Sequence, residues 1–376
     1  MRKFGLVIVV LFVVWIVWIQ IGRDATWTSS ESALDHTEVI QTDSICQKNV
    51  VGIQPYMVTN DYLSQQHFHE KLKTYFEEAK QSGYFNQNTV VLLPEYLGTW
   101  LVINEEKTSV AKTKTITGAM AIMVLSNPIS FVQSYLNHQN EGDVVAASIF
   151  RMKSKTMAAI YGNVLKKLAK TYQININSGS IILPGPSIYN NEILVDPTQP
   201  LYNTSFVFHP DGSIDTKVIK KSFPISSEIP FVTAYPIAEL PLFDLPIGKT
   251  AMLVCADSWY PESYDRINQL AAEVVLVNSY CAGTNTMAAN WKGYDGIRMP
   301  DDVDTTDVQK LKERDAWIKY ALPGRIKNTD AAIGVNVFLR GELWDLGTDG
   351  QPFFIKNGKL LETGKSERGG IWSLCF

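Results

Sequence analysis

Cysteine is scarce in this chain of 376 residues, which contains four. Their spacing includes no CxxC pair and matches no zinc-binding or redox motif, so we predict neither kind of site. A disulfide framework is not expected either, because a domain of this size buries enough core without covalent cross-links. The sequence alone does not decide whether Cys46 and Cys375 pair, and Cys281 is interpreted as an inert thiol.

Charge of one sign is also lacking, since the formal net charge is -4. No basic footprint for nucleic acid is present. The five histidines are scattered, and His67 and His69 lie two positions apart on a segment with helical spacing, so they do not share a face and we predict no metal site. No phosphate loop or dinucleotide motif occurs, so no cofactor is expected.

One long apolar run is present, over residues 4–21, and Gln20 is its only clearly polar member. At 1.5 Å per residue it reaches roughly 27 Å, close to the thickness of a bilayer core. Trp15 and Trp18 lie toward its end, where interfacial aromatic residues are favoured. We interpret residues 1–22 as an uncleaved transmembrane anchor. A cleaved signal peptide is the alternative, although the following GRDATW offers no small-x-small cleavage site.

The charges that flank this run predict its orientation. Arg2 and Lys3 precede it, whereas Arg23 follows it beside Asp24. The positive-inside rule then keeps the N-terminus in the cytoplasm and places the main domain on the extracytoplasmic side. Residues 23–47 are rich in Ser, Thr, Asp and Glu and are interpreted as a polar linker, followed by a catalytic domain over 48–376.

Apolar strands and amphipathic helices alternate along this domain, which predicts an α/β fold. Strands are expected at 50–55, 89–93, 174–183, 204–208, 214–219, 250–254, 274–277, 332–339 and 352–355, and helices at 64–82 and 157–172. Two segments, 105–156 and 284–320, do not fit this alternation. An apolar piece of the first, 119–136, predicts buried helices or a lid, with a membrane-facing lid as the alternative.

Three residues with complementary chemistry each follow an apolar strand, namely Glu95, Lys220 and Cys255. Taken singly, each residue type is more often structural. Together they supply a base, a cation and a nucleophile, which are the parts needed for acyl transfer through a thioester. Ligand sites in α/β folds gather at the carboxyl ends of strands. Cys255 also lies at a strand-to-helix turn, where a helix N-terminus would lower the pKa of the thiol.

The surrounding motifs resemble a known family. LLPEYLG around Glu95, KKSFPISSEIPF after Ile219 and LVCADSWYPE around Cys255 resemble, in that order, the three signature regions of the nitrilase superfamily of carbon–nitrogen hydrolases. The resemblance extends over roughly residues 48–376. It implies an α-β-β-α sandwich with a Glu-Lys-Cys triad, and it makes a homodimer the expected assembly.

The resemblance also implies roles for individual residues. Glu95 would be the general base, Cys255 would attack the carbonyl or nitrile carbon, and Lys220 would stabilise the tetrahedral intermediate. Glu228 matches a second glutamate of the family with an orienting role, and the backbone N–H of Ala256 would share the oxyanion with Lys220. The expected reaction is hydrolysis of a non-peptide carbon–nitrogen bond in a small amide or nitrile, through a thioester.

Several choices remain open at this point. Lys220 is preferred to Lys221 by aligning KKSF with the downstream Glu228, because neighbouring strand residues face opposite ways and only one can enter the site. The family often has a histidine two residues after its lysine, where this chain has Ser222. Trp259 is expected either to form a pocket wall or to pack in the core.

Two other functions compete with hydrolysis. An acyltransferase of the same fold, passing the acyl group to an amine near the membrane, is the first, because KKSFPISSEIP resembles the corresponding stretch of membrane-bound apolipoprotein N-acyltransferases. Those enzymes carry several membrane spans, whereas one is predicted here. A non-catalytic exported binding domain is the second, and the presence of all three triad residue types argues against it.

Overall fold

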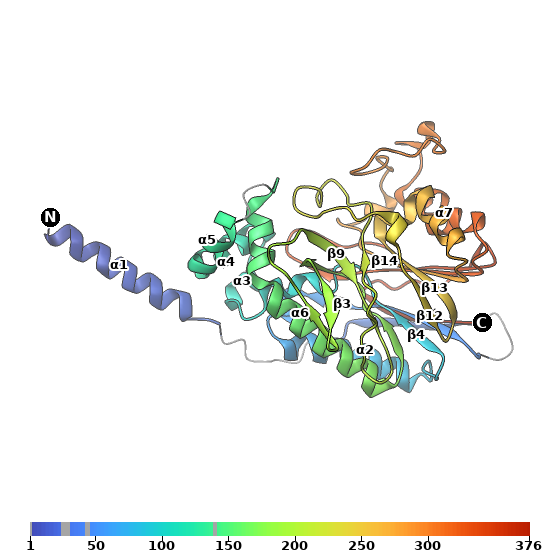
Figure 1. Cartoon of the computed structure of the whole chain (residues 1–376), viewed down its shortest axis with the longest axis horizontal. Coiled ribbons are helices and arrows are strands. Elements are labelled where there is room, and N and C mark those ends of the chain that lie inside the picture. Colours follow the sequence, from blue (N-terminus) through green and yellow to red (C-terminus); the bar gives the residue numbers. More distant parts are fainter. Residues whose placement is uncertain (1, 24–30, 42–45, 138–140) are drawn as a thin grey trace.

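The computed structural model describes residues 2–23, 31–41, 46–137 and 141–376. Two six-stranded sheets lie face to face at its centre (Figure 1). The first sheet contains, in spatial order, β1 (Leu34–Gln41), β19 (Gly369–Cys375), β2 (Asn49–Gln54), β4 (Thr89–Leu92), β5 (Asn175–Asn177) and β10 (Val207–Phe208). The second contains β12 (Leu242–Leu245), β13 (Gly248–Val254), β14 (Val274–Ser279), β15 (Ile333–Phe338), β17 (Phe353–Lys356) and β18 (Lys359–Leu360).

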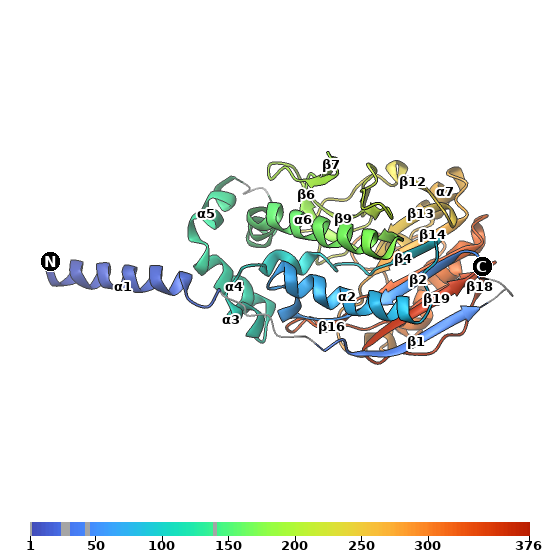
Figure 2. The ribbon, with the colours of Figure 1, turned by 90° about the horizontal axis from the view of Figure 1, so that it is seen from below.

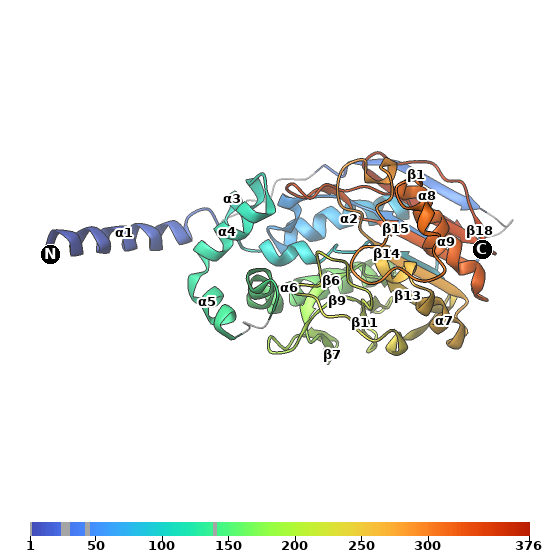
Figure 3. The same cartoon turned by 90° about the horizontal axis from the view of Figure 1, so that it is seen from above.

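Helices cover the outer face of each sheet. Against the first sheet pack α2 (Gln65–Gln81) and α6 (Val144–Tyr172) (Figure 2). Against the second pack α7 (Pro261–Gln269), α8 (Glu313–Tyr320) and α9 (Leu322–Arg325) (Figure 3). A third apolar cluster fills the space between the sheets, because strands buried on both faces are apolar along their whole length. The expected α-β-β-α sandwich is confirmed.

Shorter elements complete the domain. A three-stranded sheet contains β11 (Ile219–Lys220), β9 (Leu201–Ser205) and β6 (Ile181–Pro184), and two strand pairs join β16 (Arg340–Glu342) to β3 (Tyr56–Val58) and β7 (Ser187–Tyr189) to β8 (Glu192–Leu194). The 3-10 helices are η1 (Thr59–Tyr62), η2 (Thr99–Ile103), η3 (Ile237–Glu239), η4 (Cys255–Trp259), η5 (Thr286–Ala288), η6 (Thr305–Asp307) and η7 (Ile326–Asn328). The strand expected over 174–183 is two strands, because Gly179 turns the chain with a φ of +74° against the Pro94 carbonyl.

The stretch interpreted as a polar linker contains a strand. β1 lies at the edge of the first sheet and pairs in parallel with β19. Its inward positions include Ile40, which is buried, and His36, whose ring lies 5.3 Å from that of Trp372. The linker prediction is therefore wrong for residues 34–41, because an edge strand with one wet face carries mostly polar residues. Residues 24–30 and 42–45 of that stretch, Asp24 among them, lie outside the described residues.

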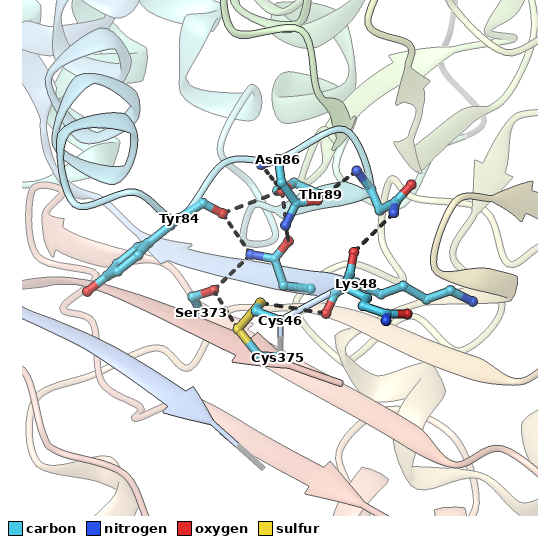
Figure 4. Close-up of a disulfide and its surroundings, with 10 residues drawn as sticks. Cys46, Lys48, Tyr84, Asn86, Thr89, Ser373 and Cys375 are labelled. Carbon is cyan, nitrogen blue, oxygen red and sulfur yellow. Dashed lines mark hydrogen bonds between the residues drawn. A yellow bond between two sulfur atoms is a disulfide. The ribbon is translucent and has the colours of Figure 1, made fainter. Parts of the chain in front are cut away.

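A disulfide joins Cys46 to Cys375, a pairing that the sequence left open. Their Cα atoms are 5.0 Å apart, and the bridge ties the residues before β2 to the end of β19 (Figure 4). Beside it, the buried Asn49 amide donates to the Tyr84 carbonyl at 2.7 Å and to Ser373 Oγ at 2.8 Å. The bridge therefore lies at the same end of the paired strands β2 and β19 as these buried hydrogen bonds.

Helix α1 (Arg2–Gln20) projects from one end of the molecule, next to α3 (Thr108–Lys112), α4 (Ile116–Ser126) and α5 (Pro128–Asn137) (Figures 1 and 3). Helices α3, α4 and α5 form the first insert, at residues 105–156, together with the start of α6. Helix α6 begins 13 residues before the expected position 157. Within the described residues, no single helix has both the length and the apolar composition needed to cross a membrane. The pair α4 and α5, bent by 103°, meets both criteria when taken together.

Candidate active site

Three chain segments bring the candidate residues together at the carboxyl ends of strands. Glu95 follows β4, Lys221 directly follows β11, and Cys255 directly follows β13. All three side chains are buried, as is that of Glu228. The structure therefore unites Glu95, Glu228 and Cys255 as the sequence predicted, with Lys221 as the cation.

Lys220 does not enter this cluster, so the choice of Lys220 over Lys221 was wrong. The Lys221 ammonium lies 2.9 Å from Glu95 Oε1 and 2.6 Å from Glu228 Oε2. Lys220 points the other way, where its ammonium lies 4.5 Å from the ring centres of both Tyr202 and Tyr235. The reason is strand geometry: Ile219 and Lys221 share the buried side of the strand, and Lys220 faces the opposite side.

The nucleophile turn is built by the backbone of Cys255, which has a φ of 48° at the junction between β13 and η4. This left-handed conformation is uncommon outside glycine and places the residue in a sharp strand-to-helix turn. The thiol lies within hydrogen-bonding reach of the Glu95 carboxylate, and its Sγ is 3.6 Å from the Tyr280 carbonyl. The predicted elbow is thus present, and Pro261 opens the helix after it.

The carboxylates and the ammonium perturb one another's pKa values strongly. Burial raises the pKa of Glu95, and the charge of Glu228 adds to this increase, while Lys221 opposes it. For Glu228 burial acts in the same direction, but the Lys221 ammonium and several hydrogen bonds outweigh it and lower the pKa. Burial would lower the pKa of Lys221, yet the two carboxylates raise it well above the ordinary value. The lysine therefore stays charged.

The pKa of the Cys255 thiol is raised, whereas the sequence led us to expect a lowered pKa. Burial raises the pKa of Cys255 well above its ordinary value, and the nearby charge of Glu95 adds to the effect, although Lys221 opposes it. The expected lowering by a helix N-terminus is wrong, because η4 is one short turn of 3-10 helix and the thiol is shielded from solvent. A protonated resting thiol next to a carboxylate needs that carboxylate as its base.

Three residues that the sequence did not single out hold this arrangement in place. Asn203 Nδ2 donates to Glu95 Oε1 and to Glu228 Oε1, both at 2.9 Å, and the Tyr96 hydroxyl donates to Glu228. Asn203 lies in strand β9 with its side chain buried. A polar amide at an inward position of a strand needs hydrogen-bond partners, and this is the sequence signal that could have identified it.

Asp257 is the third, and it links the nucleophile turn to the lysine loop. Its Oδ1 accepts the backbone N–H groups of Ser222 and Phe223 at 2.9 and 2.8 Å, and its Oδ2 accepts that of Val254 at 3.1 Å. Burial raises the pKa of Asp257 to about 7, against the opposing effects of Lys221 and of these hydrogen bonds. With Lys221 as the lysine, the position two residues later, where the family often has histidine, is Phe223, and its backbone N–H is one of those that Asp257 accepts.

Ala256 and Trp259 lie in η4 directly after the nucleophile, and both are buried. Trp259 packs among the rings of Trp291, Tyr294 and Trp317, with centroids 4.9 to 6.0 Å away. Of the two roles left open, the structure places it in core packing, against the second insert. The role of the Ala256 N–H stays a prediction. In the described part of the chain, no group of three or more His, Cys, Asp or Glu side chains could hold a metal ion.

Comparison with known proteins adds three findings. The model of the carbon–nitrogen hydrolase family matches residues 49–293. Among solved structures, a double mutant of the amidase from Nesterenkonia sp. AN1 in complex with acrylamide is similar at a TM-score of 0.50 and 14% identity, covering 88% of this chain and 90% of that one. Another mutant of that amidase carries the acetamide moiety of fluoroacetamide, added covalently at the active-site cysteine. It is similar at a TM-score of 0.51 and 14% identity, covering 88% of this chain and 91% of that one. No curated protein sequence matches.

Proposed function

Because the chain belongs to the carbon–nitrogen hydrolase family, we propose that it hydrolyses a small amide or nitrile through a thioester on Cys255. The observation that carries this proposal is the buried Lys221 ammonium held between Glu95 and Glu228, with the Cys255 thiol within hydrogen-bonding reach of Glu95. A base, a fixed cation and a nucleophile lie in one enclosed cluster. The amides in the similar amidase structures support the amide class over the nitrile class.

In the first half of the reaction, Glu95 takes the proton of the thiol as Sγ attacks the carbonyl carbon. The raised pKa of the thiol favours this concerted transfer over a preformed thiolate. The carbonyl π electrons move to oxygen, and the Lys221 ammonium and the Ala256 N–H stabilise the resulting charge. Collapse of the intermediate breaks the carbon–nitrogen bond, and protonated Glu95 returns its proton to the departing amine or ammonia.

In the second half, Glu95 removes a proton from water, whose oxygen attacks the thioester carbon. The carbon–sulfur bond then breaks, the acid leaves, and the proton returns to Sγ. Glu228 takes no proton in this scheme. Its lowered pKa keeps it ionised, so that with Asn203 it holds the ammonium of Lys221 in a fixed position.

We also propose that α1 attaches the enzyme to a membrane, with the catalytic domain on the extracytoplasmic side. Apart from Gln20, the described side chains of α1 are apolar, and most are exposed, among them Phe4, Val10, Phe12 and Val14 at 52–74% exposure. A helix that is apolar on all sides is typical of a lipid environment. The Cys46–Cys375 disulfide supports the orientation, because disulfides persist in oxidising compartments. A homodimer stays a prediction.

Acyl transfer to an amine remains the second candidate, and the apolar end formed by α1, α4 and α5 favours it, since that end would bring the site near lipid. The two candidates share the thioester and differ in the acceptor. With a water acceptor the acid accumulates, whereas with an amine acceptor a new amide accumulates.

The test is ammonia release from a panel of linear amides, nitriles and carbamoyl compounds, using the full chain in detergent. Cys255→Ala is the inactive control, because it removes the nucleophile from a buried position with a small loss of volume. Release by the parent that is absent in the variant supports hydrolysis. Equal release from both proteins contradicts it, and a new amide formed only when an amine is added would move the assignment to acyl transfer.

A further inference from the structure

The end of the molecule that carries α1 also carries a second apolar surface, here called the α4–α5 patch. Its members are exposed apolar side chains on two short helices: Leu125 at 54%, Ile129 at 82%, Val132 at 51%, Tyr135 at 37% and Leu136 at 64%. No charged residue occurs between Ile116 and Asn137. A contiguous apolar surface of this kind marks a binding face for another apolar phase.

A buried polar cluster fixes this patch relative to α1. At its centre is Glu106, whose fully buried carboxylate accepts from Arg23 at 3.3 Å, from Asn127 at 2.9 Å and from Lys153 at 2.9 Å. Arg23 follows α1 and also donates to the Ser126 carbonyl at 2.8 Å. The end of α1 and the corner between α4 and α5 are therefore held by the same carboxylate.

Lys107 strengthens this joint from the other side. Its ammonium donates to the carbonyls of Trp18 and Ile21, which have no partners within the helix because α1 ends there. The same ammonium lies 4.5 Å from the centre of the Trp18 ring. The Thr108 N–H donates to the Gly22 carbonyl at 2.8 Å. A tryptophan with a lysine at the end of an apolar helix is typical of the boundary between lipid tails and headgroups.

From these observations we propose that the α4–α5 patch lies in the surface of the lipid bilayer that receives α1. Helices α1, α4 and α5 lie at the same end of the molecule (Figures 2 and 3), where the polar contacts of Arg23, Glu106 and Lys107 connect them. One lipid phase covers both surfaces together, whereas a protein partner on the patch would cover only one of them. The 103° bend at Asn127, whose amide is bound to Glu106, makes the pair lie along the interface instead of crossing it.

The same end of the molecule is connected to the candidate active site. The Asp143 N–H, just before α6, donates to the Pro230 carbonyl at 2.9 Å, and Phe150 stacks on Phe231 with ring centres 5.7 Å apart. Pro230 and Phe231 belong to the loop that carries Glu228. The start of α6, which packs against α5, thus joins the patch to the loop of the second glutamate. This places the loop on the side of the proposed lipid surface, a position suited to a substrate dissolved in or attached to the membrane.

The test places a fluorescent thiol label at Ile129→Cys in the full chain, reconstituted in phosphatidylcholine vesicles with brominated or ordinary acyl chains. Val10→Cys on α1 is the positive control, and Leu360→Cys on β18, exposed at 36% at the far end of the molecule, is the negative control. Both free cysteines are buried, and the labelled parent chain measures any background. We expect brominated chains to lower the fluorescence at least twofold at positions 129 and 10, and to leave position 360 unchanged.

Each other outcome overturns the proposal. Quenching at position 10 without quenching at 129 places α1 in lipid and the patch in water. Quenching at neither position shows that the end of the molecule does not enter the bilayer, and then the attachment by α1 fails as well. Efficient cross-linking of two Ile129→Cys chains without lipid quenching assigns the patch to a second copy of the chain.

Discussion

Replacing Lys221 by methionine should distinguish most clearly the role of Lys221 from that of the neighbouring Lys220. Its ammonium lies 2.9 and 2.6 Å from two carboxylates, and at an effective dielectric constant near 20 each pair attracts by roughly 6 kcal/mol before desolvation is counted. Removing one partner of a buried ion pair lowers the free energy of unfolding by about 3–5 kcal/mol. Loss of an oxyanion donor lowers kcat by about 10²–10³. We expect Lys221→Met to show both losses.

Lys220→Met is the matched control, one residue away with the same change in side chain. Its ammonium contacts two tyrosine rings at a half-exposed position, an interaction of about 0.5–1 kcal/mol. We expect nearly unchanged activity and a small decrease in stability. Ammonia release and denaturant unfolding measure the two effects, and the rate at which Cys255 is alkylated by acrylamide gives a readout that needs no knowledge of the substrate.

A second variant keeps the test interpretable if Lys221→Met does not fold. Lys221→Met combined with Glu228→Gln removes one cation and one anion, so the cluster keeps its original net charge. We expect this double variant to recover part of the lost stability and none of the lost activity. A fully active Lys221→Met protein beside an inactive Lys220→Met protein would refute the assignment of the catalytic lysine.

Three further outcomes follow from contacts described above. Glu228→Gln should move the acidic limb of the kcat/KM profile to lower pH, because the charge of Glu228 helps to raise the pKa of Glu95, which must be ionised to act as base; a shift to higher pH would contradict this. Cys46→Ser should lower the free energy of unfolding by about 2–5 kcal/mol in oxidising buffer and have no effect on the reduced protein, as denaturant titration would measure. Asp257→Asn should slow alkylation of Cys255 and lower the free energy of unfolding by about 1–3 kcal/mol, because an asparagine amide cannot accept all three backbone N–H groups and leaves at least one unpaired. An unchanged alkylation rate and stability would show that other contacts hold the nucleophile turn.

The catalytic cluster shows how far the sequence could lead. Glu95 and Cys255 were found because each follows an apolar strand within a recognisable motif, and Glu228 was found through the resemblance of its motif to the family. The lysine was missed by one position, although the argument that only one of two neighbours can enter the site was sound. Ile219 is apolar and buried, so the residue two positions later shares its side of the strand. That alternation points to Lys221 and would have outweighed the alignment.

Other features could not be read from local pattern. β1 was missed because only one of its faces meets the core, and its stabilisation comes from pairing with β19, more than 300 residues away in sequence. The Cys46–Cys375 pair is separated by 329 positions, so proximity is decided by the sheet and not by spacing. An amide in strand β9 could have drawn attention to Asn203, but the partners of Asn203, and the loop residues Ser222 and Phe223 that Asp257 binds, are brought close only by folding.

The disulfide also has a consequence for the integrity of the molecule. The disulfide (Figure 4) makes residues 46–375 a covalent ring that includes every candidate catalytic side chain and every strand of the two sheets except β1. Helix α1 and β1 lie on the tail that precedes the ring. A protease that cuts once within this ring releases nothing, since the two pieces stay joined through sulfur. Such a nicked protein would migrate as one band without reductant and as two with it. Only a cut between α1 and Cys46 would separate the catalytic domain from the helix.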